Sequence, residues 1–305
     1  MVSKTIKKII FGYFKFLFPS VIKEWKNRNK YIFNDINRPI SNNKVNLFWT
    51  GTFEGEVTNH ENLGDYLSLV IVNKLLSESK LNLDTETDRT YYLYAIGSII
   101  GYGYQDAVIW GSGLLTYRNV LRCLRQKFDI RAVRGPCTKK ILCEYGIKCP
   151  EIYGDPACLL PLFYKPNVKK RWKYSIILHH KSKYRNNEYL KKYIKERGVH
   201  YIEIMTIDYK KFVEEILSSE YIISSALHGI ILSESYGIST IFLRENLGQD
   251  LKFDDWYYST ERFEYIYIND MSEILKDKAN IVPNVKNMQL NLIDTFPYDL
   301  WKKDE

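Results

Sequence analysis

The stretch YIISSALHGIILSESY, residues 221–236, is the most informative part of the chain. It starts as an apolar strand, passes through two serines, and begins a helix at His228 and Gly229. In open α/β sheets, ligands lie beyond the carboxyl ends of strands and beside helix N-termini, which favour anions. We therefore expect His228 to lie beside an anion site, where Gly229 lets the backbone come close. The alternative is a capped core helix that contains a satisfied histidine.

The same alternation of strand and helix is predicted along most of the chain. It implies parallel sheets with helices on both faces. The predicted fold class is α/β, with two Rossmann-like domains that face a cleft. Strands are predicted at 45–49, 91–97, 107–110, 130–133, 152–154, 174–178, 201–204, 221–223 and 240–243. Helices are predicted at 62–76, 117–128, 136–146, 187–197, 208–219, from 228 onward and at 287–301.

This pattern also predicts how the chain is divided. We expect an N-terminal segment and linker over 1–44 and a first Rossmann-like domain over 45–165. A second Rossmann-like domain is expected over 166–285, with the interdomain linker within 164–173. Residues 286–305 are expected to form a C-terminal helix that returns to the first domain.

Residues 1–30 carry most of the net charge. They hold eight basic residues and one acidic residue, so that they supply +7 of the total of +8. A nearly neutral remainder argues against a nucleic-acid-binding domain. Aromatic and aliphatic residues interleave with the lysines too often for a bilayer-spanning helix, but they fit a helix that lies on an anionic membrane surface. A docking helix and a basic partner-binding tail are the alternatives.

The cysteines do not indicate a metal site. All five lie between positions 123 and 158, no pair has CxxC spacing, and no histidine occurs between His60 and His179. We therefore expect no zinc site and no metal. A secretory signal with a cleavage site is not found, so reduced thiols in the cytosol are expected.

Polar residues at predicted strand ends are the first candidates for chemistry. Asp65, in NLGD at 62–65, is a base, a group that orients a hydroxyl, or simply a helix N-cap. Ser112 and Gly113 follow a strand, where the backbone can approach a ligand. Arg134, in RAVRGP at 131–136, can bind carboxylate or phosphate in a bidentate manner. The alternative for Arg134 is a structural salt bridge to Asp155.

Two later segments are further candidates. KFDDWYYS at 252–259 mixes a cation, carboxylates and aromatic rings in a predicted loop after the last strand. Planar faces beside hydrogen-bonding groups suit a sugar site, although the segment can equally be a solvated loop with buried tyrosines. His179 and His180 end a strand of the second domain and face the same cleft.

Seven motifs occur in an order that resembles the polysaccharide pyruvyl transferase family. They are NLGD (62–65), IWGSG (109–113), VRGP (133–136), YGDPA (153–157), ILHHK (177–181), SSALHG (224–229) and KFDDWYYS (252–259). The resemblance covers about residues 45–262 and implies a fold like that of two-domain GT-B glycosyltransferases. It implies transfer from phosphoenolpyruvate to two sugar hydroxyls, which makes a cyclic pyruvate ketal without a cofactor. The first domain would be the acceptor side and the second the donor side.

The resemblance also assigns roles to residues. It implies that His228 and Asp65 are catalytic, that Arg134 binds phosphoenolpyruvate, and that Asn62 and Gly64 lie near the sugar acceptor. The full predicted substrate-binding set is Arg134, Asn62, Gly64, Ser112, Gly113, His179, Ser225, Gly229, Lys252 and Ser259. This chain has Ala226 where many members have arginine, and Arg244 or Arg262 is a candidate to compensate.

These features leave three functions open. The first is a pyruvyl transferase that acts on a surface or capsular polysaccharide or its lipid-linked precursor. The second is a glycosyltransferase of the same architecture that uses a nucleotide sugar. The third, favoured by Ala226, is a membrane-associated assembly protein with a degenerate site. The expected location is cytoplasmic and peripheral on the inner face of the cell membrane.

Overall fold

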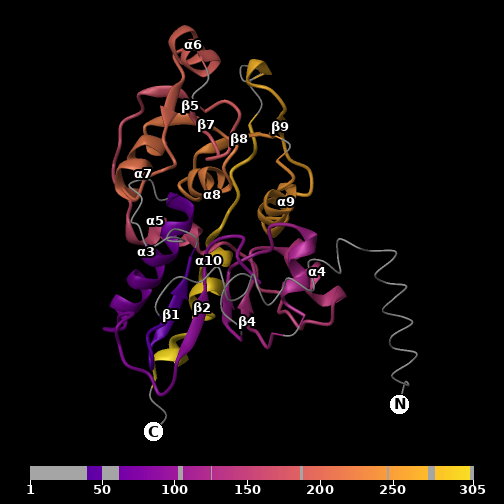
Figure 1. The fold of residues 1–305 in the computed structure, drawn as a ribbon. Coiled ribbons are helices and arrows are strands. Elements are labelled where there is room, and N and C mark those ends of the chain that lie inside the picture. Colours follow the sequence, from indigo (N-terminus) through magenta and orange to yellow (C-terminus); the bar gives the residue numbers. More distant parts are fainter. Residues whose placement is uncertain are drawn as a thin grey trace, which may run out of the picture.

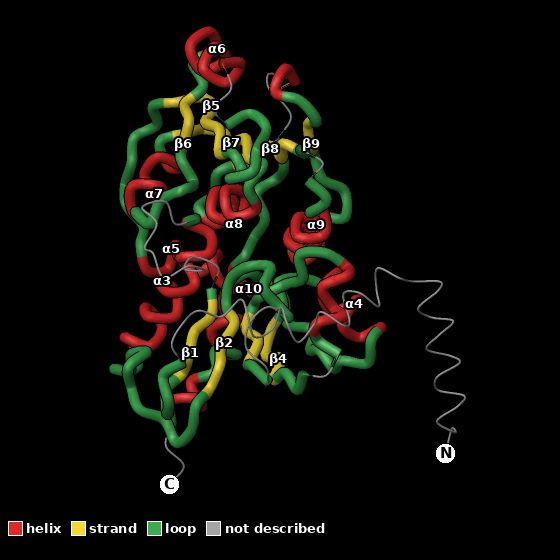
Figure 2. Tube along the Cα trace, in the orientation of Figure 1, coloured by secondary structure: helices red, strands yellow, loops and turns green. Residues whose placement is uncertain are grey.

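A computed structural model of the chain shows two parallel sheets, one above the other, with helices around them (Figures 1 and 2). The predicted α/β class with two Rossmann-like units is confirmed. The structure describes residues 40–49, 62–101, 106–124, 126–185, 188–245, 247–273 and 279–302. Of the predicted N-terminal segment and linker, residues 1–39 lie outside this part of the chain.

The first sheet has the strand order β1-β2-β3-β4, and every pair is parallel. An isolated parallel bridge between Val133 and Tyr153 extends its β4 edge. The strands are β1 (Val45–Phe48), β2 (Tyr91–Tyr94), β3 (Val108–Trp110) and β4 (Asp129–Ala132). The associated helices are α3 (Leu63–Glu78), the 3-10 helix η1 (Tyr117–Arg122), α4 (Pro136–Glu144), the 3-10 helix η2 (Pro156–Leu159) and α5 (Leu160–Phe163).

The second sheet has the order β6-β5-β7-β8-β9 and is also parallel. Its order reverses between β5 and β7, and ligands of such sheets bind outside the strand ends at this reversal. The strands are β5 (Trp172–Ile177), β6 (His200–Ile202), β7 (Ser219–Ser224), β8 (Ser239–Leu243) and β9 (Tyr267–Ile268). The helices are α6 (Glu188–Arg197), α7 (Tyr209–Leu217), α8 (Leu227–Ser235), α9 (Asp250–Ser259) and the 3-10 helix η3 (Met271–Glu273).

The prediction of a loop over 252–259 is wrong, because these residues form most of α9. Phe253, Trp256 and Tyr257 recur at the spacing of one helix face and are buried. The indole N–H of Trp256 donates to the buried carboxylate of Glu234. Buried partners thus stabilise a helix whose mixed polar and aromatic composition resembles that of a loop.

Two other predicted helices differ from the observed ones. The helix expected over 117–128 is the short 3-10 helix η1, where Asn119 bonds back to Thr116 and fixes a tight turn. The helix expected over 287–301 is divided into α10 (Lys286–Asp294) and the 3-10 helix η4 (Tyr298–Trp301). Pro297 lies between them and has no N–H to continue the helix. The short strand β9 was not predicted.

The C-terminal segment packs on the first sheet and its helices, where α10 contacts η2 and the end of β3. The indole of Trp110 donates to the carbonyl of Leu292 at 2.9 Å. Gln289 donates to the carbonyl of Cys158 at 2.7 Å. The chain therefore crosses between the two sheets twice.

A buried ion pair joins the first domain to the second. Arg134, which follows β4, and Asp255 in α9 are both fully buried, and Nη2 lies 3.0 Å from Oδ2. The backbone and hydroxyl of Thr138 in α4 donate to the same carboxylate. At Gly135, an added Cβ would lie 2.2 Å from the carbonyl oxygen of Asp255. We call this contact the Arg134–Asp255 clamp. It holds α9 in close contact with the start of α4.

Among the helices of the described residues, none has the length and apolar character needed to cross a bilayer.

Replacing Asp255 with alanine should lower the free energy of unfolding by about 3–5 kcal/mol, because it leaves the Arg134 guanidinium buried and uncompensated. Chemical denaturation measures this change. Glu151→Ala is the matched control, because Glu151 forms an exposed pair with Lys139 and its loss should leave the midpoint unchanged. Equal midpoints for the two variants would show that the clamp does not stabilise the fold.

Candidate functional site

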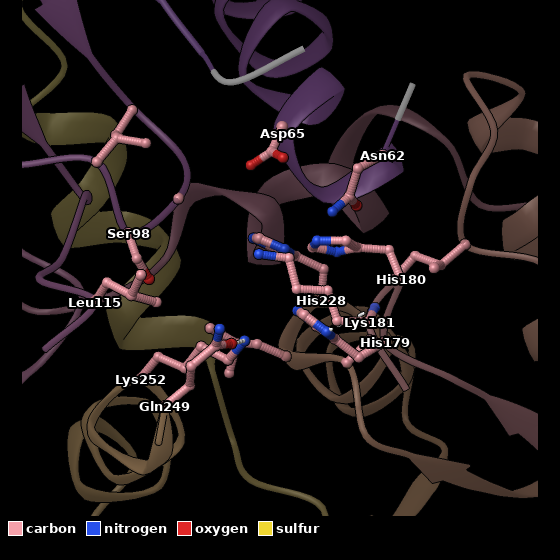
Figure 3. A pocket seen from close by; sticks show the side chains of 15 residues that line it. Asn62, Asp65, Ser98, Leu115, His179, His180, Lys181, His228, Gln249 and Lys252 are labelled. Carbon is pink, nitrogen blue, oxygen red and sulfur yellow. Dashed lines mark hydrogen bonds between the residues drawn. The ribbon is translucent and has the colours of Figure 1, made fainter. Parts of the chain in front are cut away.

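A cavity of 290 Å³ lies where the two sheets face each other. The first-sheet side contributes Asn62, Asp65, Ser98 and Leu115. The second-sheet side contributes His179, His180, Lys181, His228, Gln249 and Lys252. Figure 3 shows Asn62 and Asp65 on one side of the cavity and Gln249 and Lys252 on the other, with His228 between them. His179 and His228 follow β5 and β7, so the cavity lies at the reversal in strand order.

Three helices begin at this cavity. They are α3, α8 and α9, whose first residues or N-caps line it. The N-terminal turn of a helix presents free N–H groups and a partial positive charge. At the start of α8, Ala226 makes no side-chain capping bond. The start of α8 is therefore suited to an anion.

The cap of α3 is Asn62 rather than Asp65. Its side-chain oxygen accepts a hydrogen bond of 3.1 Å from the N–H of Gly64. The N–H of Leu63 donates to the carbonyl of Ile204 at 3.0 Å, which ties the start of α3 to the second domain. Asp65 lies in the first helical turn and lines the cavity, so the interpretation of Asp65 as the N-cap is wrong.

His228 lies between the two domains, and 12% of its side chain is exposed. Its Nε2 is 3.5 Å from Oδ2 of Asp155, which is fully buried. On the other side of the ring, a Cβ added to Gly64 would lie 2.0 Å from Nδ1. Only glycine at position 64 lets α3 approach the imidazole this closely, so the NLGD and SSALHG motifs meet at one point.

Lys252 is a buried cation at the start of α9. Its Nζ donates to the side-chain oxygen of Gln249 at 2.6 Å. Burial, together with the positive charge of Arg134, lowers the pKa of Lys252 to about 7. Lys252 can therefore gain or lose a proton near neutral pH.

His179 is neutral in this environment. Burial, with a further contribution from Lys252, lowers the pKa of His179 to about 3. Its Nδ1 accepts a hydrogen bond from the N–H of Lys181 at 3.2 Å, which leaves the ring proton on Nε2. Among the described residues, Lys181 and Lys252 are the lysines that line the cavity.

Five of the predicted site residues line the cavity: Asn62, Asp65, His179, His228 and Lys252. Three other predicted residues contact the cavity-lining residues or the strand that precedes them. Gly64 contacts His228, the hydroxyl of Ser225 accepts from the N–H of His179, and Gly229 packs against the hydroxyl of Ser224.

The remaining predicted residues lie away from the cavity. Arg134 is fully buried, and it donates to Ser98 at 2.6 Å and to the carbonyl of Leu114 at 2.8 Å besides its pair with Asp255. The structural salt bridge is therefore present, but the proposed partner Asp155 is wrong. Ser112 donates to the carbonyl of Ala95, and Gly113 gives room to the Arg134 guanidinium. Ser259 bonds to Trp256 at the far end of α9 from Lys252.

Neither arginine considered as a substitute for the missing one at Ala226 reaches the cavity. Arg244 pairs with Asp250, and Arg262 pairs with the buried Glu234. Ser98 and Lys181 also line the cavity but are absent from the predicted site residues, and Asp155, expected beside Arg134, contacts His228 instead. Asp155 and Lys181 lie within the quoted motifs, but nothing local indicates that Asp155 faces His228 rather than Arg134. Within the described part of the chain, no cluster of three or more His, Cys, Asp or Glu side chains could hold a metal.

A second cavity of 570 Å³ lies beside Arg262 and Asn280. Both side chains are already bonded within the protein, Arg262 to Glu234 and Asn280 to Thr240 and Ile266. Its polar groups are therefore less available to a ligand than those around His228.

Comparison with known proteins gives similarities to a family, to a viral protein and to a solved structure. The profile of the family described as polysaccharide pyruvyl transferase matches residues 62–246. An uncharacterised protein of Acanthamoeba polyphaga mimivirus is 28% identical over 246 residues, which cover 77% of this chain and 80% of the viral protein. A solved structure of an uncharacterised protein from Klebsiella pneumoniae subsp. pneumoniae aligns with a TM-score of 0.46 and 12% identity, over 82% of this chain and 98% of that one.

Binding of sulfate to the cavity should weaken as pH rises above about 7, by up to about tenfold per pH unit, because Lys252 loses its proton there. Sulfate keeps its own charge over this pH range, so a change in affinity reports a change in the protonation of the protein. Calorimetric titration between pH 6 and pH 9 measures it. In Lys252→Arg, whose guanidinium stays charged, the affinity should be nearly constant. The same pH dependence in both proteins would assign it to another group.

Proposed function

Because the chain belongs to the polysaccharide pyruvyl transferase family, we propose that it transfers a pyruvyl group from phosphoenolpyruvate to two hydroxyls of a sugar. The acceptor is a surface or capsular polysaccharide or its lipid-linked precursor. The observation that carries the proposal is the meeting of His228, Lys252 and the starts of three helices at one cavity.

The distribution of charge around the cavity suits this donor. Phosphoenolpyruvate carries about three negative charges near neutral pH, and it needs cations and helix N-termini to hold it. Lys181, Lys252 and the start of α8 all lie on the second-sheet side. Asp65 and Asn62 lie on the opposite side, where a carboxylate and an amide can bind sugar hydroxyls. The donor is therefore assigned to the second domain and the acceptor to the first.

The reaction needs proton transfer at the place where His228 lies. The first sugar hydroxyl adds across the double bond of phosphoenolpyruvate: its oxygen bonds to C2 and a proton reaches C3, which becomes a methyl group. The second hydroxyl displaces phosphate from C2, and its proton leaves on the phosphate. A histidine between acceptor and donor can move these protons. Arg134 acts indirectly in this proposal, since it holds Ser98 and, through Asp255, the helix of Lys252.

Mass spectrometry of the surface glycan from cells with and without this protein tests the function. The expected difference is one pyruvyl ketal on a sugar. A missing monosaccharide would instead support the nucleotide-sugar glycosyltransferase. A glycan of unaltered composition but lower abundance would support an assembly protein with a degenerate site, the alternative that Ala226 favours.

Replacing His228 with alanine should reduce turnover by at least about 10²- to 10⁴-fold, the usual contribution of a general acid–base group. The fold should persist, as judged by a cooperative unfolding transition. His200→Ala is a matched control, because His200 stacks on Trp172 and begins β6 at the opposite end of the sheet. Near wild-type turnover of His228→Ala would remove His228 from the chemistry.

We further propose that residues 1–30 hold the protein on the cytoplasmic face of an anionic membrane, where a lipid-linked acceptor would be found. Deleting them should abolish co-sedimentation with anionic vesicles but preserve activity on a short soluble acceptor. Each basic residue near such a surface contributes about 1 kcal/mol, and salt should weaken the binding. If the full-length protein does not co-sediment at low salt, the segment has another role.

A further inference from the structure

The carboxylate of Asp155 is fixed through one oxygen and open at the other. Asp155 caps η2, where Oδ1 accepts a hydrogen bond of 3.0 Å from the N–H of Ala157. Oδ2 is buried and has no hydrogen-bond partner among the described residues. A buried carboxylate oxygen without a donor is destabilising. The fold thus holds an acceptor in place for a donor that it does not otherwise supply.

The nearest candidate donor is His228. Its Nε2 lies 3.5 Å from Oδ2, is buried, and likewise has no hydrogen-bond partner in the described part of the chain. A proton on Nε2 satisfies both atoms after a movement of roughly 0.5 Å, which brings them to the usual hydrogen-bond distance. An unprotonated Nε2 would place two lone pairs opposite each other in a buried contact.

We infer that Asp155 is a positioning residue that keeps His228 in the tautomer with its proton on Nε2 and its lone pair on Nδ1. This inference rests on the proposed function and names the reacting atom. Nδ1 lies at the edge of the ring that contacts Gly64, where a Cβ would be 2.0 Å away. Gly64 packs against this edge without a side chain that would cover Nδ1, and 12% of the His228 side chain stays exposed beside the cavity-lining Asn62 and Asp65.

The tautomer decides how the proton moves. The proton of the first sugar hydroxyl passes to Nδ1. The imidazolium formed is stabilised by the Asp155 carboxylate through Nε2–H. The proton passes on from Nδ1 to C3, which takes up the electron pair of the double bond, and in the same step the deprotonated hydroxyl oxygen bonds to C2. Asp155 does not touch the substrate in this scheme and keeps its own charge throughout.

The experiment is nitrogen NMR of the full-length protein labelled at histidine, combined with turnover of Asp155→Asn. The His228 signals are identified by their loss in His228→Gln. In the wild type, Nε2 should carry the proton and Nδ1 should not. In Asp155→Asn, Oδ1 can still cap η2, so the amide nitrogen faces His228 as a donor and the proton should move to Nδ1. Turnover should then fall about 10²- to 10⁴-fold, with the KM for phosphoenolpyruvate changed less than about twofold.

The matched control is Asp208→Asn, the same substitution at the exposed N-cap of α7, where Asp208 accepts from the N–H of Lys211. It should alter neither the tautomer nor the turnover. A proton on Nδ1 of wild-type His228, or unchanged turnover in Asp155→Asn, would overturn the inference. If Asp155→Asn does not fold, the wild-type spectrum alone tests the inference. A protein that shows the Nε2 tautomer but never uses phosphoenolpyruvate would instead overturn the proposed function, and with it the role of Asp155 in turnover.

Discussion

The buried pair of Arg134 and Asp255 holds α9 of the second domain against α4 of the first. Two charges removed from water are tolerated only when they are paired and hydrogen-bonded. Here Thr138 donates to the carboxylate, and the two terminal nitrogens of the guanidinium donate to Ser98 and to the carbonyl of Leu114. The pair fixes α9 against the first domain and so places Lys252 opposite Asp65 across the cavity. The charge of Arg134 also contributes to the low pKa of Lys252.

Four of the seven quoted motifs fall into two groups in this fold. NLGD and SSALHG bring Asn62, Asp65 and His228 to the cavity, and Gly64 permits their close approach. VRGP supplies Arg134 instead, and Gly113 of IWGSG leaves room for its buried guanidinium. A residue such as Arg134 can therefore be essential to the site through packing and electrostatics, without a direct contact to a ligand.

Sequence reasoning predicted features that depend on local pattern. Strand–helix alternation gave two parallel sheets, and the position of His228 after an apolar strand placed it correctly at a helix start. Pairings across long stretches of chain could not be predicted in this way. Arg134 meets Asp255 rather than Asp155, and Asp155 meets His228. The sequence predicts a loop where α9 lies, because the polar residues of this helix find buried partners that only the folded chain supplies.

In the proposed function, one cavity at the strand reversal of the second sheet binds an anionic three-carbon donor. Calorimetric titration of the full-length protein with phosphoenolpyruvate, and separately with a uridine diphosphate sugar, tests it most directly. We predict saturable binding of phosphoenolpyruvate at one site per chain, and loss of this binding in Lys252→Met, which removes the cation but keeps a side chain of similar length. Saturable binding of the nucleotide sugar, together with no detectable binding of phosphoenolpyruvate, would contradict the account.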